Sequence, residues 1–203
     1  MPFPDEVGPV VLVEYREQWA EDFAILAGSL QQLELAELGA IEHVGSTSIP
    51  GLVAKDVIDA QVRVPFLDVL SISVRFADAG FRRRSEEWNN HESTRLGVVP
   101  KLVFAPPVGA RRVNVHVRTD GTQGARDTLL FRDCLRSEAK QRIWWDGIKR
   151  AIIESSNSID LANYGQAKQA LWGELMSRAD AWAANRAWQP SPLVAWSSIG
   201  ESH

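Results

Sequence analysis

The chain has 203 residues, 45% of them hydrophobic and 24% charged, and a formal net charge of −4. This composition fits a packed core in one domain, and the negative charge argues against general affinity for the nucleic-acid backbone, which requires a basic face. The one cysteine, Cys134, excludes an intramolecular disulfide and a multi-cysteine zinc site.

The N-terminal part predicts a strand, a helix and a turn. Asp5 and Glu6 stand where a signal peptide would be basic, and no apolar run approaches ~20 residues, so we expect a cytoplasmic protein without a membrane partner. A short apolar run at 10–13 predicts a strand. Hydrophobic residues then recur every three or four positions, which predicts an amphipathic helix over about 16–38. Another short apolar run, 40–44, leads into a turn.

Residues 57–64 alternate between apolar and polar side chains, which predicts a strand with two distinct faces. Asp59, Gln61 and Arg63 share the polar face. A helix over 66–79 is expected to follow.

Two further strands are predicted at 101–105 and 111–118, joined by a hairpin-type connection. In the second strand, valines alternate with polar residues, so Asn114, His116 and Arg118 share one face. A strand with an apolar back and a polar front of this kind is a candidate floor for a binding site.

The remaining chain predicts helices over 126–139, 141–154 and 160–184, with a structural thiol at Cys134. Residues rich in proline and serine follow, and they predict a flexible tail. We therefore expect one domain over 1–186 and a tail over 187–203. Strands followed by helices indicate an α+β domain, with a small mixed sheet backed by helices.

The turn after the second apolar run has the composition of an anion site. Small residues let backbone N–H groups approach an anion closely, and hydroxyl groups add donors. Lys55 adds positive charge, and Asp59 could hold a divalent metal ion over bound phosphates. The candidate phosphate-binding residues of the turn are Gly45, Ser46, Thr47 and Ser48.

One stretch is long and specific enough to indicate a family. It comprises His43 to Leu52, then Lys55, then Ile58-Asp59. This stretch resembles the signature of the GrpB family, a His-Val-Gly-Ser-Thr-Ser-Ile-Pro-Gly-Leu segment followed by Lys and Ile-Asp. Further matches follow in the same order within residues 10–181: residues 109–118, 130–133 and 135–136, Lys149, and Tyr164 with Lys168.

The resemblance implies a fold and additional site residues. The GrpB family is similar in fold to the nucleotidyltransferase superfamily and also occurs fused to dephospho-coenzyme A kinases in some bacteria. We therefore expect a nucleotidyltransferase-like mixed β-sheet flanked by helices, with a helical C-terminal half. The resemblance also moves Lys149 and Lys168, otherwise ordinary surface lysines, towards a phosphate. A guanidinium fork suits the same task, so Arg118 and Arg132 are further candidates, although Arg132 could equally form a surface ion pair with Asp133.

The expected metal-binding residues depart from the superfamily's pattern. Active nucleotidyltransferases place two carboxylates two residues apart on this strand and a third on its neighbour, since a paired-metal site neutralises both the attacking and the departing oxygen. Here Asp59 is followed by Gln61, and the neighbouring strand offers Asn114 and His116. These four residues could hold one Mg²⁺ or Mn²⁺ ion weakly, with Asp59 and His116 as catalytic candidates. We therefore expect a reduced or altered activity.

The first hypothesis is a nucleotidyltransferase-like protein that binds a nucleotide or another phosphorylated ligand, such as a coenzyme A precursor, with a divalent metal ion. The alternative is a non-catalytic ligand-binding or folding-assistance module, related to the domain fused to dephospho-coenzyme A kinases. A metal-dependent phosphohydrolase that uses His116 and Asp59 is a weaker third hypothesis, because one His and one Asp make a thin ligand set.

Overall fold

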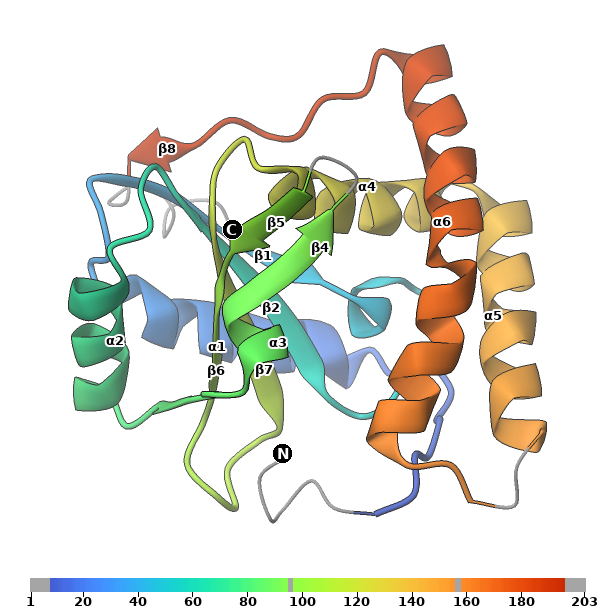
Figure 1. Cartoon of the computed structure of the whole chain (residues 1–203), viewed down its shortest axis with the longest axis horizontal. Coiled ribbons are helices and arrows are strands. Elements are labelled where there is room, and N and C mark those ends of the chain that lie inside the picture. The colour runs from blue at the N-terminus through green and yellow to red at the C-terminus, as the bar shows by residue number, and fades with distance from the viewer. Residues whose placement is uncertain (1–7, 95–96, 156–157, 196–203) are drawn as a thin grey trace.

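The computed structural model describes residues 8–94, 97–155 and 158–195 and is built around a mixed six-stranded sheet (Figure 1). The strand order is β3-β6-β7-β2-β1-β8. The strands β2 and β7 are parallel, and the other neighbours in this sheet are antiparallel. The bounds are Leu38–Val44 (β1), Ile58–Val64 (β2), Arg82–Arg83 (β3), Leu102–Ala105 (β6), Val113–Thr119 (β7) and Val194–Ala195 (β8). A separate hairpin joins β4 (His91–Thr94) to β5 (Gly97–Pro100).

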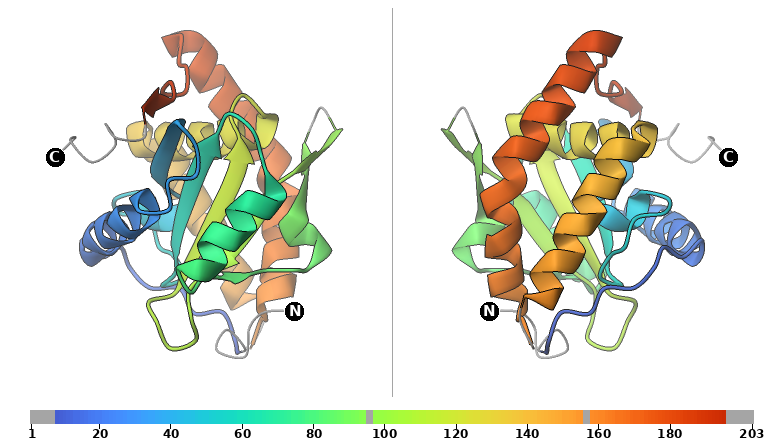
Figure 2. Two further views of the ribbon diagram at one scale, coloured as in Figure 1. Left: turned by 90° about the vertical axis from the view of Figure 1, so that its left-hand side faces the viewer. Right: turned by 90° about the vertical axis from the view of Figure 1, so that its right-hand side faces the viewer.

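Helices flank the sheet, and three long ones make up most of the C-terminal half (Figure 1). The bounds are Gln18–Gln31 (α1), Ser46–Ser48 (η2, a short 3-10 helix), Val69–Asp78 (α2), Glu87–Asn90 (α3), Gln123–Ser137 (α4), Ala139–Glu154 (α5) and Leu161–Arg186 (α6). Figure 2 shows α5 and α6 lying side by side. The predicted α+β class, with a mixed sheet flanked by helices and a helical C-terminal half, is confirmed. Among the described residues, no helix is both long and apolar enough to cross a membrane.

Two hydrophobic cores hold the molecule together. The first lies between the apolar face of the sheet and the helices α1 and α2, and it includes the alternating residues of β2 and β7. The second lies among α4, α5 and α6. Ile49 and Leu52, which directly follow η2, are fully buried in this second core. The turn before η2 is therefore fixed between the sheet and the helical half.

The N-terminal predictions need two corrections. Residues 10–13 form no full strand, because only Val13 makes a β-bridge, to Ala54. The first helix ends at Gln31 rather than near 38, since the chain turns at Glu34, which has a positive φ of 46°. Leu33 packs into the first core from this turn, so its hydrophobic spacing continues although the helix does not.

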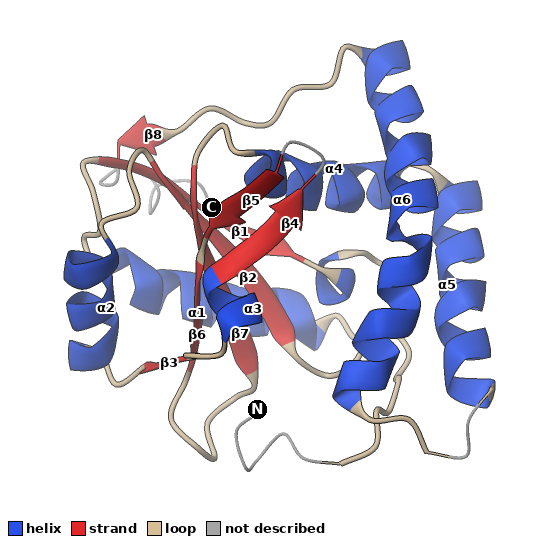
Figure 3. Ribbon diagram, viewed as in Figure 1, coloured by secondary structure: helices blue, strands red, loops and turns tan. Residues whose placement is uncertain are grey.

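The segment after α6 differs from the predicted flexible tail. Residues 187–195, here called the C-terminal strap, run from the end of α6 across to β8 at the edge of the sheet (Figure 3). The Trp188 Nε1 donates a hydrogen bond of 3.0 Å to Asp133 of α4, and β8 pairs with Leu38 and Gly39 of β1. Composition predicts a tail here, but tryptophan packing and strand pairing place the strap on the sheet. The rest of the predicted tail, 196–203, lies outside the described residues.

Candidate functional site

The serine-bearing turn and the strand carboxylate lie in direct contact. The strands β1 and β2 are antiparallel, so Val44 at the end of β1 lies opposite Asp59 near the start of β2. Gly45 follows with a φ of 68° and a ψ of −171°, a conformation that is essentially restricted to glycine. A Cβ atom added to Gly45 would lie 2.5 Å from Asp59 Oδ2. Glycine is thus required here both by the backbone and by the nearby carboxylate.

The neighbouring strand surrounds Asp59 with polar groups. Because β2 and β7 are parallel, Asn114 lies beside Asp59, and His116 lies two residues further along β7, beside Gln61. The Asn114 amide donates a 3.0 Å hydrogen bond to Asp59 Oδ1, and His116 Nε2 lies 3.9 Å from the same oxygen. Burial alone would raise the pKa of Asp59, but His116, Asn114 and the charge of Lys55 outweigh it and lower the pKa. Asp59 is therefore an ionised carboxylate at neutral pH.

His116 is a neutral imidazole at the floor of the site. Burial lowers its pKa, and the charges of Arg118 and Lys101 lower it further, against the opposing effect of Asp59. Its Nδ1 is buried and has no hydrogen-bond partner among the described residues. The imidazole thus has one ring nitrogen, Nε2, turned towards Asp59.

A buried lysine reaches the turn from the helical half. Lys149 of α5 is 1% exposed, and its Nζ lies 3.2 Å from Ser46 Oγ and hydrogen-bonds the Val53 carbonyl. Asp146, one turn earlier on α5, accepts a 2.9 Å hydrogen bond from the Val53 amide. The helix α5 therefore hydrogen-bonds both the N–H and the carbonyl of Val53. Among the described residues Lys149 forms no ion pair with a carboxylate. Burial and the charge of Lys168 lower the pKa of Lys149 to about 7.

A second lysine lies on α6 beside the same site. The Lys168 ammonium lies 4.7 Å from the centre of the Tyr164 ring, a cation–π contact with a buried tyrosine. Burial and the charge of Lys55 lower the pKa of Lys168 to about 8, against the effect of Asp59. The charge of Lys55 thus acts on Lys168, and the charge of Lys168 acts on Lys149, although the three lysines lie on separate segments of the chain.

Gln61 and Arg118 are engaged in a buried network instead of facing Asp59. Gln61 is fully buried, donates a 3.1 Å hydrogen bond to the Ala125 carbonyl of α4, and accepts a 3.0 Å hydrogen bond from Arg118. Arg118 also makes two 2.8 Å contacts with the Glu92 carboxylate of β4. The Gln61 amide, predicted as a metal ligand, and the Arg118 guanidinium, predicted to bind phosphate, therefore have their hydrogen-bonding partners within the protein.

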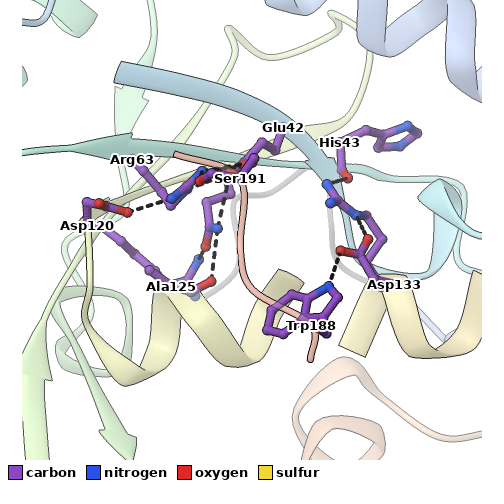
Figure 4. Close-up of polar contacts among 11 residues, drawn as sticks. Glu42, His43, Arg63, Asp120, Ala125, Asp133, Trp188 and Ser191 are labelled. Carbon is purple, nitrogen blue, oxygen red and sulfur yellow. Dashed lines mark hydrogen bonds and ion pairs between the residues drawn. The ribbon is translucent and has the colours of Figure 1, made fainter. Parts of the chain in front are cut away.

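This network continues along β1 to the C-terminal strap (Figure 4). Glu42 lies opposite Gln61 and accepts two hydrogen bonds from the Arg63 guanidinium, at 2.7 and 3.0 Å. Ser191 of the strap donates a 3.1 Å hydrogen bond to Glu42, and the Ser191 carbonyl accepts one of 2.8 Å from Arg63. Sequence reasoning did not identify Glu42, Glu92 or Ser191. A lone acidic residue in the apolar run before the turn was the available signal for Glu42.

The remaining predicted residues support the turn from behind. Arg132 pairs with Asp133 at 2.6 Å and donates to the His43 carbonyl at 3.3 Å (Figure 4). The buried Thr47 hydroxyl hydrogen-bonds the His43 ring at 3.1 Å, and the Ser48 hydroxyl donates to the Gly45 carbonyl at 2.7 Å. The structure thus brings Gly45, Ser46, Asp59, Asn114, His116 and Lys149 to one site, and the charges of Lys55 and Lys168 interact with Asp59 there. Thr47, Ser48 and Arg132 brace it.

Comparisons with known proteins agree on one family. A family model described as GrpB protein matches residues 9–178. A UPF0157 protein of Streptomyces coelicolor is 33% identical over 180 residues, which cover 84% of this chain and 84% of that protein. A dephospho-CoA kinase of Mycolicibacterium paratuberculosis is 28% identical over a match that covers 90% of this chain, although this chain spans only 49% of that protein's length. The crystal structure of the conserved protein GrpB from Enterococcus faecalis superposes with a TM-score of 0.68 at 25% identity, covering 85% of this chain and 99% of that one. The chain belongs to the GrpB family.

Proposed function

We propose that this protein binds a nucleotide, or another phosphorylated ligand such as a coenzyme A precursor, beside the Gly45-Ser46 turn and Asp59, which lie in contact with each other. One observation carries the proposal. A nearly fully buried lysine, Lys149, hydrogen-bonds Ser46 and has no carboxylate partner among the described residues. Burying a cation that forms no ion pair is costly. The charge of Asp146 offsets part of this cost, but the Asp146 carboxylate already contacts the Val53 amide and Arg150, and a bound phosphate at the turn would lower the cost further.

A divalent metal ion fits this site singly and not as a pair. The second carboxylate of a paired-metal site is replaced by Gln61, whose amide is already hydrogen-bonded within the protein. Asn114 and His116 contact Oδ1 of Asp59, which leaves Oδ2 to face a metal ion. One Mg²⁺ or Mn²⁺ ion would be held by Asp59 together with phosphate oxygens, and would supply charge neutralisation there. Nucleotidyl transfer, if the protein performs it, depends on this carboxylate.

Isothermal titration with ATP, GTP, CTP and UTP, with and without Mg²⁺ or Mn²⁺, tests the proposal. We expect at least one nucleotide to bind, and Lys149→Met to weaken it by about tenfold or more, the effect of losing one charge-assisted hydrogen bond. Lys140→Met is the matched control, since Lys140 is an exposed lysine at the other end of the same helix. Thermal unfolding of each variant separates loss of binding from loss of folding. Absence of binding across all nucleotides and coenzyme A precursors would reject the proposal.

A non-catalytic role is the second candidate, and the buried network favours it. Gln61 is locked at the position where catalysis by two metal ions requires a carboxylate. The match to one half of a dephospho-CoA kinase is also consistent with a module that binds a ligand for another domain. The substitution Asp59→Asn separates the two roles. A binding module keeps its ligand and shows no turnover in either form, whereas an enzyme loses measurable nucleotidyl transfer.

A further inference from the structure

A surface groove of about 610 Å³ lies between α2, β3 and the base of the β4–β5 hairpin. Its described lining residues include none of those predicted for the candidate site. Leu67 and Leu102, which belong to the first core, contribute buried apolar side chains to the groove. Val69, Arg83 and Pro100 also line it and are exposed, so it is an open groove and not an enclosed pocket.

The guanidinium of Arg83 is held in this groove by neutral partners. Its Nη2 donates a 2.7 Å hydrogen bond to Asn90 Oδ1, and its Nη1 lies 3.4 Å from the Ser73 hydroxyl. The Asn90 amide in turn donates hydrogen bonds of 3.0 and 2.8 Å to the Ser85 and Glu86 carbonyls. Among the described residues, Arg83 pairs with no carboxylate. A guanidinium fixed between α2 and α3 therefore keeps a positive charge that the protein does not neutralise.

The groove as a whole is positive. Lys101 also lines it, and its Nζ lies 3.6 Å from Glu92 Oε2. That carboxylate also contacts Arg118 at 2.8 Å, so it is shared between two cations. Glu87 is the one acidic residue among the described residues that line the groove. The charges of Arg83 and Lys101 thus outnumber that of Glu87, which favours an acidic ligand.

The helix α2 has apolar residues on its outer face as well as on the face that packs into the first core. Leu70 and Val74, one turn apart, are 76% and 50% exposed, and Phe66, just before the helix, is 75% exposed. Ser73, which contacts Arg83, lies between Leu70 and Val74 in the sequence, so this stripe borders the groove. In the left view of Figure 2, α2 faces the viewer, and no described helix or strand covers it. Large apolar side chains next to an arginine are typical of protein interfaces.

We propose that this groove and the outer stripe of α2 dock a segment of a partner protein, which places an acidic side chain on Arg83 and apolar side chains on Leu70 and Val74. The guanidinium fork suits a carboxylate because it can bind both oxygens. A second copy of this chain fits less well, since a twofold interface here would bring two identical positive grooves together. The inference is independent of the proposed function.

Panning a displayed library of random peptides against the full chain tests the inference. We expect the enriched peptides to share an Asp or Glu flanked by apolar residues. A synthetic peptide of that sequence should bind Arg83→Gln about tenfold or more weakly, the effect of losing a charge-assisted hydrogen bond, while Arg178→Gln on α6 is the matched control. Leu70→Ser should also weaken the peptide, whereas Ile25→Ser should not, although Ile25 is similarly exposed, at 72%.

Three results would overturn the inference: no enriched sequence, enriched peptides without an acidic residue, or equal affinity for Arg83→Gln and the native chain. Light scattering that shows a dimer, dissociated by Leu70→Ser, would mean that a second copy covers this surface and would also overturn it. Thermal unfolding of each variant verifies that it folds. Nucleotide titration of Arg83→Gln keeps the two proposals apart, because the groove shares no described residue with the candidate site and nucleotide affinity should stay unchanged.

Discussion

Replacing Gly45 with alanine tests the contact on which the whole site depends. At a φ of 68° and a ψ of −171°, a non-glycine residue is strained by about 1–3 kcal/mol. The new Cβ would also lie 2.5 Å from Asp59 Oδ2 and 2.9 Å from Asp59 Cβ, so the strand or the turn must shift, which adds about 1–3 kcal/mol. We expect Gly45→Ala to lower the free energy of unfolding by about 2–6 kcal/mol and to abolish phosphate binding.

The matched control is Gly121→Ala. Gly121 has a φ of 74°, close to that of Gly45, but an added Cβ would have no atom within 4 Å. This control therefore gives the cost of a left-handed φ without a close contact, and urea denaturation of both variants gives as the difference the combined contribution of the ψ of Gly45 and its contact with Asp59. In an Asp59→Ala background the cost of Gly45→Ala should shrink, since part of the obstruction is gone. If Gly45→Ala destabilises the protein no more than Gly121→Ala, the turn and the carboxylate do not meet as described.

Three further predictions concern charge and packing. The pKa of Lys149 is about 7, below its ordinary value of 10.5, so the unfolded chain binds more protons than the folded one between these pH values. The free energy of unfolding should therefore rise with pH over this window more steeply in the native protein than in Lys149→Met, as denaturation across the pH range would show. Ligand affinity should fall over the same window, which titration would measure. Glu42→Ala leaves the Arg63 guanidinium buried with only Asp120 and Ser191 as partners, and should cost about 3–5 kcal/mol of stability by urea denaturation, whereas a loss below 1 kcal/mol would contradict the network. Trp188→Ala removes a partly buried ring and its hydrogen bond to Asp133, and should cost about 2–4 kcal/mol by the same measurement; an unchanged value would mean that the C-terminal strap is not docked.

The local geometry around the turn could be predicted from sequence because it depends on neighbours in the chain. Strand alternation places Asp59, Gln61 and Arg63 on one face, and the apolar residues between them do form the first core. Glycine before a serine-rich turn predicts a close backbone approach, and that approach is to Asp59 itself. The two helical lysines needed the family resemblance, since periodicity alone does not separate a buried lysine from a surface one.

The role of Gln61 could not be predicted, since its partners are distant in sequence. Alternation shows that Gln61 faces the polar side of β2, but not that Ala125 and Arg118 occupy its hydrogen-bonding groups. Likewise, composition does not show that Ser191 returns to Glu42, more than a hundred residues away in the chain. Non-local pairing of polar groups is a property of the folded topology, and no pattern within one segment specifies it.

The C-terminal strap has a mechanical consequence for the turn that precedes η2. It leaves the far end of α6 and rejoins the sheet at the outer edge of β1, the strand that leads into the turn (Figure 1). The helical half is consequently attached at the turn, through Ile49 and Leu52, and also at the outer edge of the sheet, through the strap. Attachment at separated points opposes rotation of the helical half relative to the sheet. The turn at Gly45 and the carboxylate of Asp59 are therefore held in a fixed relative position, which favours a rigid arrangement over one that changes by hinge motion.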